Sequence, residues 1–311
     1  MSALICGSLA FDTIMVFQDH FKHHILPEKI HMLNVSFLVP ELRREFGGCA
    51  GNIAYNLKLL DGNPLIMATC GADFGPYAEH LANHAISQQH ILPVPDSFTA
   101  QAYITTDLAD NQITAFHPGA MNYSHHNHVS QADGIKIGII SPDGREGMLQ
   151  HAQEFHSAGI PFVFDPGQGM PMFDGNDLMQ FIDLADYVTV NDYEAELLLN
   201  RTGQTLPELA GLVQAFIITR GEHGSQIYTA GQIINIPCAR AAAVIDPTGC
   251  GDAYRAGLLY GIINGMDWAT TGRLAALLGA IKIAQRGGQN HKPTRDEINQ
   301  LFKQEFGYDV S

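Results

Sequence analysis

The stretch Asp246-Pro247-Thr248-Gly249-Cys250-Gly251-Asp252 carries the strongest local signal in the sequence. A stripe of mostly small residues follows it at helical spacing: Ala253, Ala256, Gly257, Tyr260, Gly261 and Asn264. This spacing predicts a helix over 251–264 that packs closely on a sheet, with the glycine-rich loop at its N-terminus. Free N–H groups at such a terminus bind anions, and a carboxylate beside them can take a proton from an attacking hydroxyl. Taken alone, the pattern also fits an ordinary glycine-rich turn in which Asp252 only begins a helix.

The composition is that of a globular protein with a sizeable core. The chain has 311 residues, of which 46% are hydrophobic and 16% charged, and this length suits one large α/β domain. No apolar run is long enough to predict a membrane span, and the N-terminus does not resemble a signal peptide. The cysteines have no CxxC spacing, so we expect free thiols and a cytoplasmic location; they are Cys6, Cys49, Cys70, Cys238 and Cys250.

The net charge of −15 limits the kinds of partner. It repels nucleic acid and anionic membranes, and we expect neither as a partner. It does not exclude a small phosphate-bearing ligand, because a local group of backbone N–H donors can bind an anion inside an acidic protein.

The second half of the chain alternates between strand and helix patterns, which predicts a mostly parallel sheet covered on both faces. Strands are predicted at 135–140, 161–165, 187–190, 215–219 and 225–228, and helices at 145–158, 176–184, 193–200, 205–213, 251–264, 268–286 and 295–305. Nearer the N-terminus we predict a buried strand over 4–11 that ends at Asp12, a helix over 51–60, a strand over 64–69 and a helix over 75–88. The β-rich segments 13–45 and 98–118 break this rhythm, so we expect them to form a small separate sheet, a lid on a single domain spanning 1–311.

Four motifs in order resemble the signatures of the pfkB, or ribokinase-like, carbohydrate kinases. They are Gly47-Gly48-Cys49-Ala50-Gly51-Asn52-Ile53-Ala54, Asn191-Asp192-Tyr193-Glu194, Thr219-Arg220-Gly221-Glu222-His223-Gly224 and the stretch 246–252. The chain contains neither GxxxxGK[ST] nor GxGxxG, which disfavours a P-loop NTPase and a nicotinamide-binding Rossmann enzyme. The resemblance implies a three-layer α/β/α fold of ribokinase type and an ATP-dependent kinase that acts on an alcohol group.

By this resemblance Asp252 is the catalytic base. The backbone of Gly249, Cys250 and Gly251 would form the anion hole for the transferred phosphoryl group. Cys250 replaces the usual alanine, but its contribution would be a backbone N–H, which any residue supplies. A thiol at a helix N-terminus can have a lowered pKa, which would make Cys250 sensitive to oxidation; an inert thiol is the alternative.

On the nucleotide side, the resemblance assigns Thr219, Gly221, Gly224 and Asn191 to ATP. The first three follow a predicted strand, and nucleotides bind at the carboxyl edge of parallel strands. The segment 280–289 matches the region that closes the adenine pocket in the family.

The resemblance also implies metal ions. Glu194, with Asn191, would act on Mg²⁺ through water, and Mg²⁺ needs few protein carboxylates because it keeps several waters. Glu194 also fits the first turn of a helix, where an acid is favourable. A monovalent cation, K⁺, would lie near Asp246 and Thr248.

On the acceptor side, Asp12 would accept hydrogen bonds from two adjacent sugar hydroxyls, since a carboxylate accepts through both oxygens. Gly47, Gly48 and Asn52 would bring backbone and amide groups to the same sugar. Without the other motifs, these three would read as a helix N-terminus with glycines for close packing.

Segment 34–56 and the run from Asp246 to Arg255 look most like prokaryotic nucleoside and adenosine kinases. A nucleoside needs apolar surface over its base, and the lid residues expected to supply it are Phe11, Phe37, Leu38, Tyr103 and Phe116. The expected reaction converts a nucleoside and ATP to a nucleoside 5′-monophosphate and ADP. A free-sugar kinase of ribokinase or fructokinase type and a non-catalytic ligand-binding protein are the alternatives. The resemblance also implies a homodimer that forms through the lid.

Overall fold

The computed structural model describes residues 2–25, 34–109 and 111–310. The strands are β1 (Ser2–Cys6), β2 (Ala10–Val16), β3 (Glu41–Gly47), β4 (Asn63–Cys70), β5 (Ser87–Pro93), β6 (Ala100–Thr106), β7 (Gln112–His117), β8 (Ile135–Ile140), β9 (Phe162–Phe164), β10 (Tyr187–Asn191), β11 (Ala215–Thr219), β12 (Ser225–Thr229) and β13 (Gln232–Ile236). The α-helices are α1 (Cys49–Leu59), α2 (Gly75–Asn83), α3 (Arg145–Ala158), α4 (Gly175–Leu184), α5 (Asp192–Thr202), α6 (Leu206–Leu212), α7 (Cys250–Ile263), α8 (Trp268–Ile283) and α9 (Arg295–Phe306).

The main sheet is mostly parallel and has helices on both faces, which confirms the predicted fold class. Its strand order is β13-β12-β11-β10-β9-β8-β1-β4-β5, and only β12 and β13 run antiparallel to their neighbours. Side chains alternate between two cores, as period-two patterning requires: Ala3 and Ile5 of β1 join the core under α1, α7 and α8, whereas Leu4 and Cys6 join the core under α3, α4 and α5. No helix in the described part of the chain is long and apolar enough to cross a membrane.

The predicted first strand over 4–11 is wrong in one respect that matters for the site. Strand β1 ends at Cys6, and β2 begins at Ala10 in a different sheet, so Asp12 lies inside β2 and not at the end of the first strand. Ser8 donates its backbone N–H to the carbonyl of Pro142, which carries the chain off the main sheet. The hydrophobic pattern does not show where the first strand ends, because every residue from Leu4 to Phe11 is buried on both sides of the break.

Both edges of the main sheet differ from the sequence prediction. Helix α2 ends at Asn83, and Ser87–Pro93 forms β5, so the predicted helix over 75–88 covers a helix, a turn and part of a strand. Strand β13 was not predicted. It follows β12 through the tight turn Ala230-Gly231, in which both residues have positive φ, as two-residue hairpin turns require.

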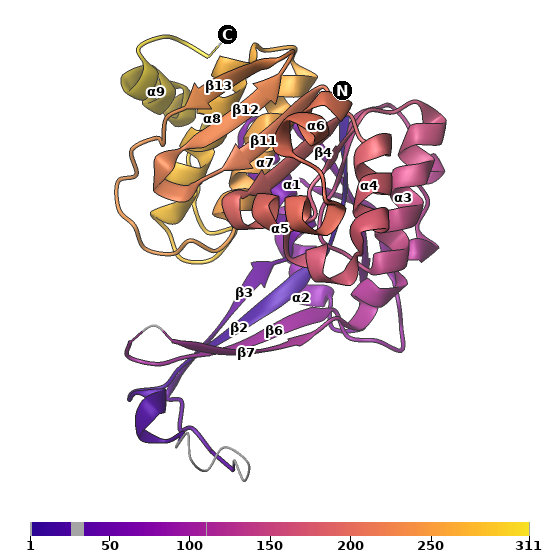
Figure 1. Ribbon diagram of the computed structural model, residues 1–311. Coiled ribbons are helices and arrows are strands. Elements are labelled where there is room, and N and C mark those ends of the chain that lie inside the picture. The colour runs from indigo at the N-terminus through magenta and orange to yellow at the C-terminus, as the bar shows by residue number, and fades with distance from the viewer. Residues whose placement is uncertain (1, 26–33, 110, 311) are drawn as a thin grey trace.

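The second sheet has the order β3-β2-β6-β7 and projects from the main body in Figure 1. Its strands come from the segments 13–45 and 98–118 that the sequence sets apart, although β2 begins earlier, at Ala10. Residues 26–33 of the first segment, residue 110 of the second, and residues 1 and 311 of the predicted single domain lie outside the described residues. We call this sheet the lid.

Candidate active site

The N-terminus of α7 forms the loop that the sequence singled out. Gly249 is the N-cap residue and has φ 76°, a left-handed conformation that favours glycine. In the described structure, the N–H groups of Gly249 and Gly251 donate to no protein acceptor, whereas that of Cys250 donates to the carbonyl of Pro247. Two of the three amides predicted to form an anion hole are therefore free to bind a phosphoryl oxygen.

Asp252 lies in the first turn of α7 and contacts α1 directly. Its Oδ2 accepts a hydrogen bond of 2.8 Å from Nδ2 of Asn52. Burial raises the pKa of Asp252 to about 6, and the hydrogen bond from Asn52 and the charge of Arg255 oppose that rise. A carboxylate with this pKa is ionised at neutral pH and is a stronger base than an ordinary aspartate, as proton abstraction from a hydroxyl requires.

The turn before α1 joins the lid to this carboxylate. Gly48 is the N-cap of α1 with φ 84°, and a Cβ there would lie 2.5 Å from the carbonyl oxygen of Ser8. At Gly47 a Cβ would lie 2.5 Å from Oδ2 of Asp12. Gly48 is therefore required by its backbone conformation and by the close approach of Ser8, whereas a side chain at Gly47 would displace the carboxylate of Asp12.

Asp12 belongs to the same electrostatic site as Asp252. Burial raises the pKa of Asp12 to about 6, and the charges of Asp252, Asp246 and Glu45 raise it further. The structure therefore brings together the predicted base and the predicted acceptor residues, from the lid strands β2 and β3 and from helices α1 and α7. These residues lie far apart in the sequence and come together only in the folded protein.

A buried ion pair anchors α7 to the main sheet, and this pairing was not predicted from the sequence. Nη2 of Arg255 donates to Oδ1 of Asp165 at 2.7 Å, and Oδ2 of Asp165 accepts from Ser141 at 2.9 Å. Both charged side chains are less than one-tenth exposed. Because Arg255 lies one helical turn after Asp252, the pair fixes the first turn of α7 against the carboxyl ends of β8 and β9.

Asn191 and Glu194 form a capping box at the start of α5. The side chain of Asn191 accepts from the N–H of Glu194 at 2.7 Å, and Oε2 of Glu194 accepts from the N–H of Asn191 at 2.8 Å. Arg255 lies 4.0 Å from the same oxygen. The described residues contain no cluster of three or more metal-ligating side chains. Glu194 therefore fits Mg²⁺ through water, with one carboxylate oxygen available, and does not fit a direct protein cage.

The surroundings of Asp246 do not fit a monovalent cation. Its carboxylate accepts from the N–H of Thr248 at 2.9 Å and from that of Gly287 at 2.8 Å. Its carbonyl accepts from Nζ of Lys282 at 2.7 Å, and the same ammonium donates to the carbonyl of Gln285 at 3.0 Å. Lys282 is fully buried and, within the described chain, forms no ion pair with a carboxylate. The ammonium of Lys282 thus already supplies a positive charge beside the carbonyls of Asp246 and Gln285.

Cys250 does not have the lowered pKa considered from the sequence. Burial raises the pKa of its thiol to about 11, with Lys282 opposing this rise and Asp246 and Asp252 adding to it. Burial outweighs the effect of the helix N-terminus here, so the thiol is protonated at neutral pH. The raised pKa favours the inert alternative for Cys250.

The residues predicted to bind ATP lie at the end of β11 and in the turn that follows. Thr219 ends β11, while Gly221 and Gly224 have φ 53° and 76°. A Cβ on Gly224 would lie 2.1 Å from the carbonyl of Ile236, so this glycine is required by packing against β13. Thr219 pairs in register with Asn191 of β10, which brings these two predicted ATP residues to the same edge of the sheet.

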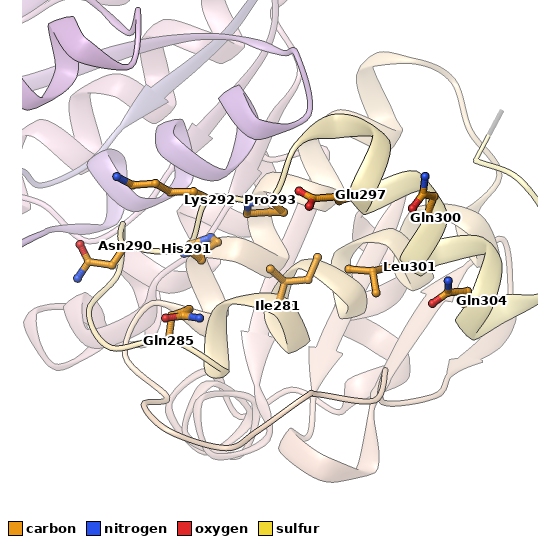
Figure 2. A pocket seen from close by; sticks show the side chains of 10 residues that line it. All are labelled: Ile281, Gln285, Asn290, His291, Lys292, Pro293, Glu297, Gln300, Leu301 and Gln304. Atoms are coloured by element: carbon orange, nitrogen blue, oxygen red, sulfur yellow. The ribbon is translucent and has the colours of Figure 1, made fainter.

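A separate groove of about 600 Å³ lies between α8 and α9. Figure 2 shows the residues that line it: Ile281, Gln285, Asn290, His291, Lys292, Pro293, Glu297, Gln300, Leu301 and Gln304. None of the predicted catalytic or acceptor residues is among them. The groove shares no side chain with the cluster around Asp252. We take that cluster as the candidate active site because it groups the predicted base with the predicted acceptor residues.

Comparison with known proteins identifies the family. The sequence model of the pfkB family carbohydrate kinases matches residues 11–295 of this chain. The chain belongs to this family. The resemblance seen in the four motifs is thereby confirmed, as is the predicted enzyme class, a kinase with an alcohol group as acceptor.

Proteins of known structure that are similar to this chain include nucleoside kinases and, at lower identity, ribokinases. The chain is 55% identical to the nucleoside kinase of Burkholderia thailandensis in complex with inosine, with a TM-score of 0.91 and 99% of each chain covered. The structure of that protein in complex with ADP-inosine matches at 56% identity with a TM-score of 0.89, covering 99% of this chain and 97% of the other. A nucleoside kinase of Methanocaldococcus jannaschii is 32% identical over 87% of this chain and 90% of its own.

Proposed function

We propose that this protein is an ATP-dependent nucleoside kinase that makes a nucleoside 5′-monophosphate. The observation that carries the proposal is the similarity, over nearly the whole of both chains, to a nucleoside kinase in complex with inosine. The grouping of Asp12, Gly47 and Asn52 around Asp252 supports it from the chemistry of the site. ATP is the phosphate donor, in agreement with the ADP-inosine complex of the same relative.

In the proposed reaction, Asp252 takes the proton of the 5′-hydroxyl as that oxygen attacks the γ-phosphorus of ATP in line with the leaving ADP. The free N–H groups of Gly249 and Gly251, at the positive end of the α7 dipole, stabilise the charge that develops on the phosphoryl oxygens. Asp12 accepts hydrogen bonds from two ribose hydroxyls and so orients the 5′-hydroxyl toward Asp252. Mg²⁺, held through water near Glu194, would neutralise charge on the phosphates.

Strand register supports a base site on one face of the lid. Asp12 is paired with Ala102 of β6, which in turn is paired with Phe116 of β7, so these three side chains share a face. Ile14 and Ile104 follow on that face one pleat further along. We propose that the ribose binds at Asp12 and that this apolar strip covers the base.

The other lid residues named from the sequence play different roles. Phe11 is buried beneath the guanidinium of Arg44, 3.6 Å from the ring centre, and Phe37 packs among other aromatic rings. Tyr103 pairs in register with Thr13 and therefore lies on the face opposite Asp12. Leu38 is exposed and lies outside the strands of the lid. Of the five, Phe116 fits the base site best, because it is exposed and shares the face of Asp12.

The opposite face of the lid supports the proposal of a homodimer. Its exposed apolar residues include Leu42, Tyr103 and Ile113, and the edge strand β7 is exposed along its whole length. An apolar face beside an open strand edge is a favourable surface for a second copy. Sedimentation of the wild type and of Leu42→Lys tests this: a monomeric wild type would rule the dimer out.

Two further proposals concern ions and location. We propose that turnover does not depend on K⁺, because the ammonium of Lys282 already lies between the carbonyls of Asp246 and Gln285. The five cysteines are free thiols, which supports the proposed cytoplasmic location.

The test of the function is a coupled ADP-release assay with ATP and Mg²⁺. The acceptor panel contains adenosine, inosine, guanosine, cytidine, ribose, fructose and fructose 6-phosphate, and Asp252→Ala is the control. We expect turnover on a nucleoside that falls by roughly 10²-fold or more in Asp252→Ala. Turnover confined to a free sugar would overturn the nucleoside assignment while leaving the kinase chemistry intact.

A further inference from the structure

A chain of buried hydrogen bonds leads from the lid to the proposed catalytic base. The hydroxyl of Tyr77 donates to the carbonyl of Gly47 at 2.7 Å, and Nε2 of Gln289 donates both to that hydroxyl at 2.7 Å and to Oδ1 of Asn52 at 3.0 Å. Nδ2 of Asn52 then donates to Oδ2 of Asp252 at 2.8 Å. Tyr77, Gln289 and Asn52 are all at least 95% buried.

The carbonyl of Gly47, the first acceptor, fixes the direction of every hydrogen bond in this series. A backbone carbonyl such as that of Gly47 only accepts, so the Tyr77 hydroxyl must donate to it and must accept from Gln289. Gln289 therefore presents its amide nitrogen to Tyr77, and the second hydrogen of that nitrogen reaches Oδ1 of Asn52. Asn52, accepting on one side, has only its NH₂ group left for Asp252.

His80 fixes the other end of Gln289. Its Nε2 lies 2.9 Å from Oε1 of Gln289, and because that oxygen only accepts, Nε2 carries the proton. Burial lowers the pKa of His80, so the ring is neutral and this tautomer is the one present at neutral pH. The ring stacks on Phe46 at 4.1 Å between centres, which holds it in place. Both ends of the Gln289 amide are thus satisfied in one orientation only.

We infer that Gln289 is a positioning residue: it orients the Asn52 amide so that Asp252 always meets a donor and is kept as an ionised acceptor. The inference rests on the proposed role of Asp252 as base. If the Asn52 amide turned over, its oxygen would face the Asp252 carboxylate and its NH₂ would face that of Gln289. Two acceptors in contact favour protonation of Asp252, and a protonated Asp252 cannot take the proton of the hydroxyl.

The other groups around Asp252 do not replace this donor. The charge of Arg255 favours the ionised form from within α7, and Cys49 on α1 also lowers the pKa of the carboxylate. Asp165 from the end of β9 and Asp12 from the lid oppose ionisation by repulsion. Asn52 is the group whose donor or acceptor sense depends on its orientation, and Gln289 controls that orientation.

The experiment compares two variants that differ in what they offer to Asn52. Gln289→Met keeps the length of the side chain but removes the donor, and Gln289→Glu presents only acceptors when ionised. The matched control is Thr271→Val, an isosteric change that removes a buried hydroxyl near the opposite end of α8. The readouts are kcat and KM for ATP and nucleoside, the pH profile of kcat/KM, and the melting temperature.

In both Gln289 variants we expect the acid limb of the kcat/KM profile to move up by about one pH unit, because a hydrogen bond to a charged group is worth about that much in pKa. At pH 6 kcat/KM should fall about fivefold, since the ionised fraction of Asp252 drops from about one half at a pKa of about 6 to about one in eleven when that pKa is one unit higher, while KM for ATP stays unchanged. Thr271→Val should keep the wild-type profile whatever its melting temperature.

Each remaining outcome has a distinct meaning. A wild-type acid limb and kcat in both Gln289 variants would refute the positioning role, and so would the same shift in Thr271→Val. Asp252→Asn, measured alongside, separates the two levels of the argument. Full activity of Asp252→Asn would overturn the proposed base itself, whereas its inactivity together with unaltered Gln289 variants would overturn only the role of Gln289.

Discussion

Replacing Asp252 by asparagine should make the protein more stable at neutral pH while removing its activity. The asparagine oxygen can still accept from Nδ2 of Asn52, so the packing is kept and only the charge is lost. The folded state of the wild type holds this carboxylate in a buried site beside Asp12, where ionisation is unfavourable. The negative charge of Asp252, the proposed base, therefore lowers the stability of the folded protein at neutral pH.

The size of the effect follows from the pKa of Asp252. The rise from its ordinary value of 3.8 to about 6 in the folded state, at about 1.4 kcal/mol for each pKa unit, gives about 3 kcal/mol. Since the folded state binds the proton more tightly, the corresponding stability is present below pH 3.8 and is lost as the pH rises through about 6. The gain in Asp252→Asn should thus be about 3 kcal/mol at pH 7.5 and about 1 kcal/mol at pH 4.5.

The assay is equilibrium unfolding in urea at both pH values, with the free energy of unfolding compared between wild type and variant. Asp246→Asn is the matched control, because its expected change in the free energy of unfolding has the opposite sign. Burial alone would raise the pKa of Asp246, but the hydrogen bonds from Gly287 and Thr248 outweigh it and the pKa is lowered. That variant should lose stability at pH 7.5. An Asp252→Asn protein that is no more stable than the wild type at pH 7.5, or that gains equally at both pH values, would refute the reasoning.

Three other changes test separate parts of the site. Gly47→Ala would place a Cβ 2.5 Å from Oδ2 of Asp12, so the KM for the nucleoside should rise steeply while the KM for ATP is unaffected; equal effects on both substrates would contradict this. Arg255→Met leaves Asp165 buried without its partner and should lower the free energy of unfolding by about 3–5 kcal/mol, measured in urea; a loss below about 1 kcal/mol, the range of an exposed pair, would show that the pair is not buried in solution. Exchanging K⁺ for tetramethylammonium should leave turnover and melting temperature unchanged, because Lys282 supplies the cation; a K⁺-dependent rise in melting temperature would count against it.

Much of the main domain could be predicted from local patterns. The strand–helix alternation after residue 135 reproduced strands β8 and β11 and the helices from α3 to α9 with small errors at their ends. The edges were missed for identifiable reasons. Strand β13 is short and depends on a turn with two positive φ values, and β5 follows α2 too closely for helical periodicity to separate them.

The site was predicted through motifs, and the residues outside motifs were the ones overlooked. Arg255 was read only as part of a family-like run, and its pairing with Asp165 depends on the approach of α7 to β9. Lys282 lies in an ordinary helical pattern, and nothing local distinguishes it from an exposed lysine. A charged residue among the apolar positions of α8 is the signal that could have drawn attention to it.

The sequence by itself determined the elements and the chemical groups. Periodicity placed the helices and strands, and the glycines at 47, 48 and 249 marked positions where the backbone must turn or approach a neighbour closely. The tertiary structure decided which groups act together. The contact of Asn52 with Asp252, the direction of the hydrogen bonds through Gln289 and the ammonium of Lys282 at the carbonyl of Asp246 all join segments far apart in the chain. Such contacts depend on the packing of whole helices, and pKa shifts depend on burial, so neither can be read from local spacing.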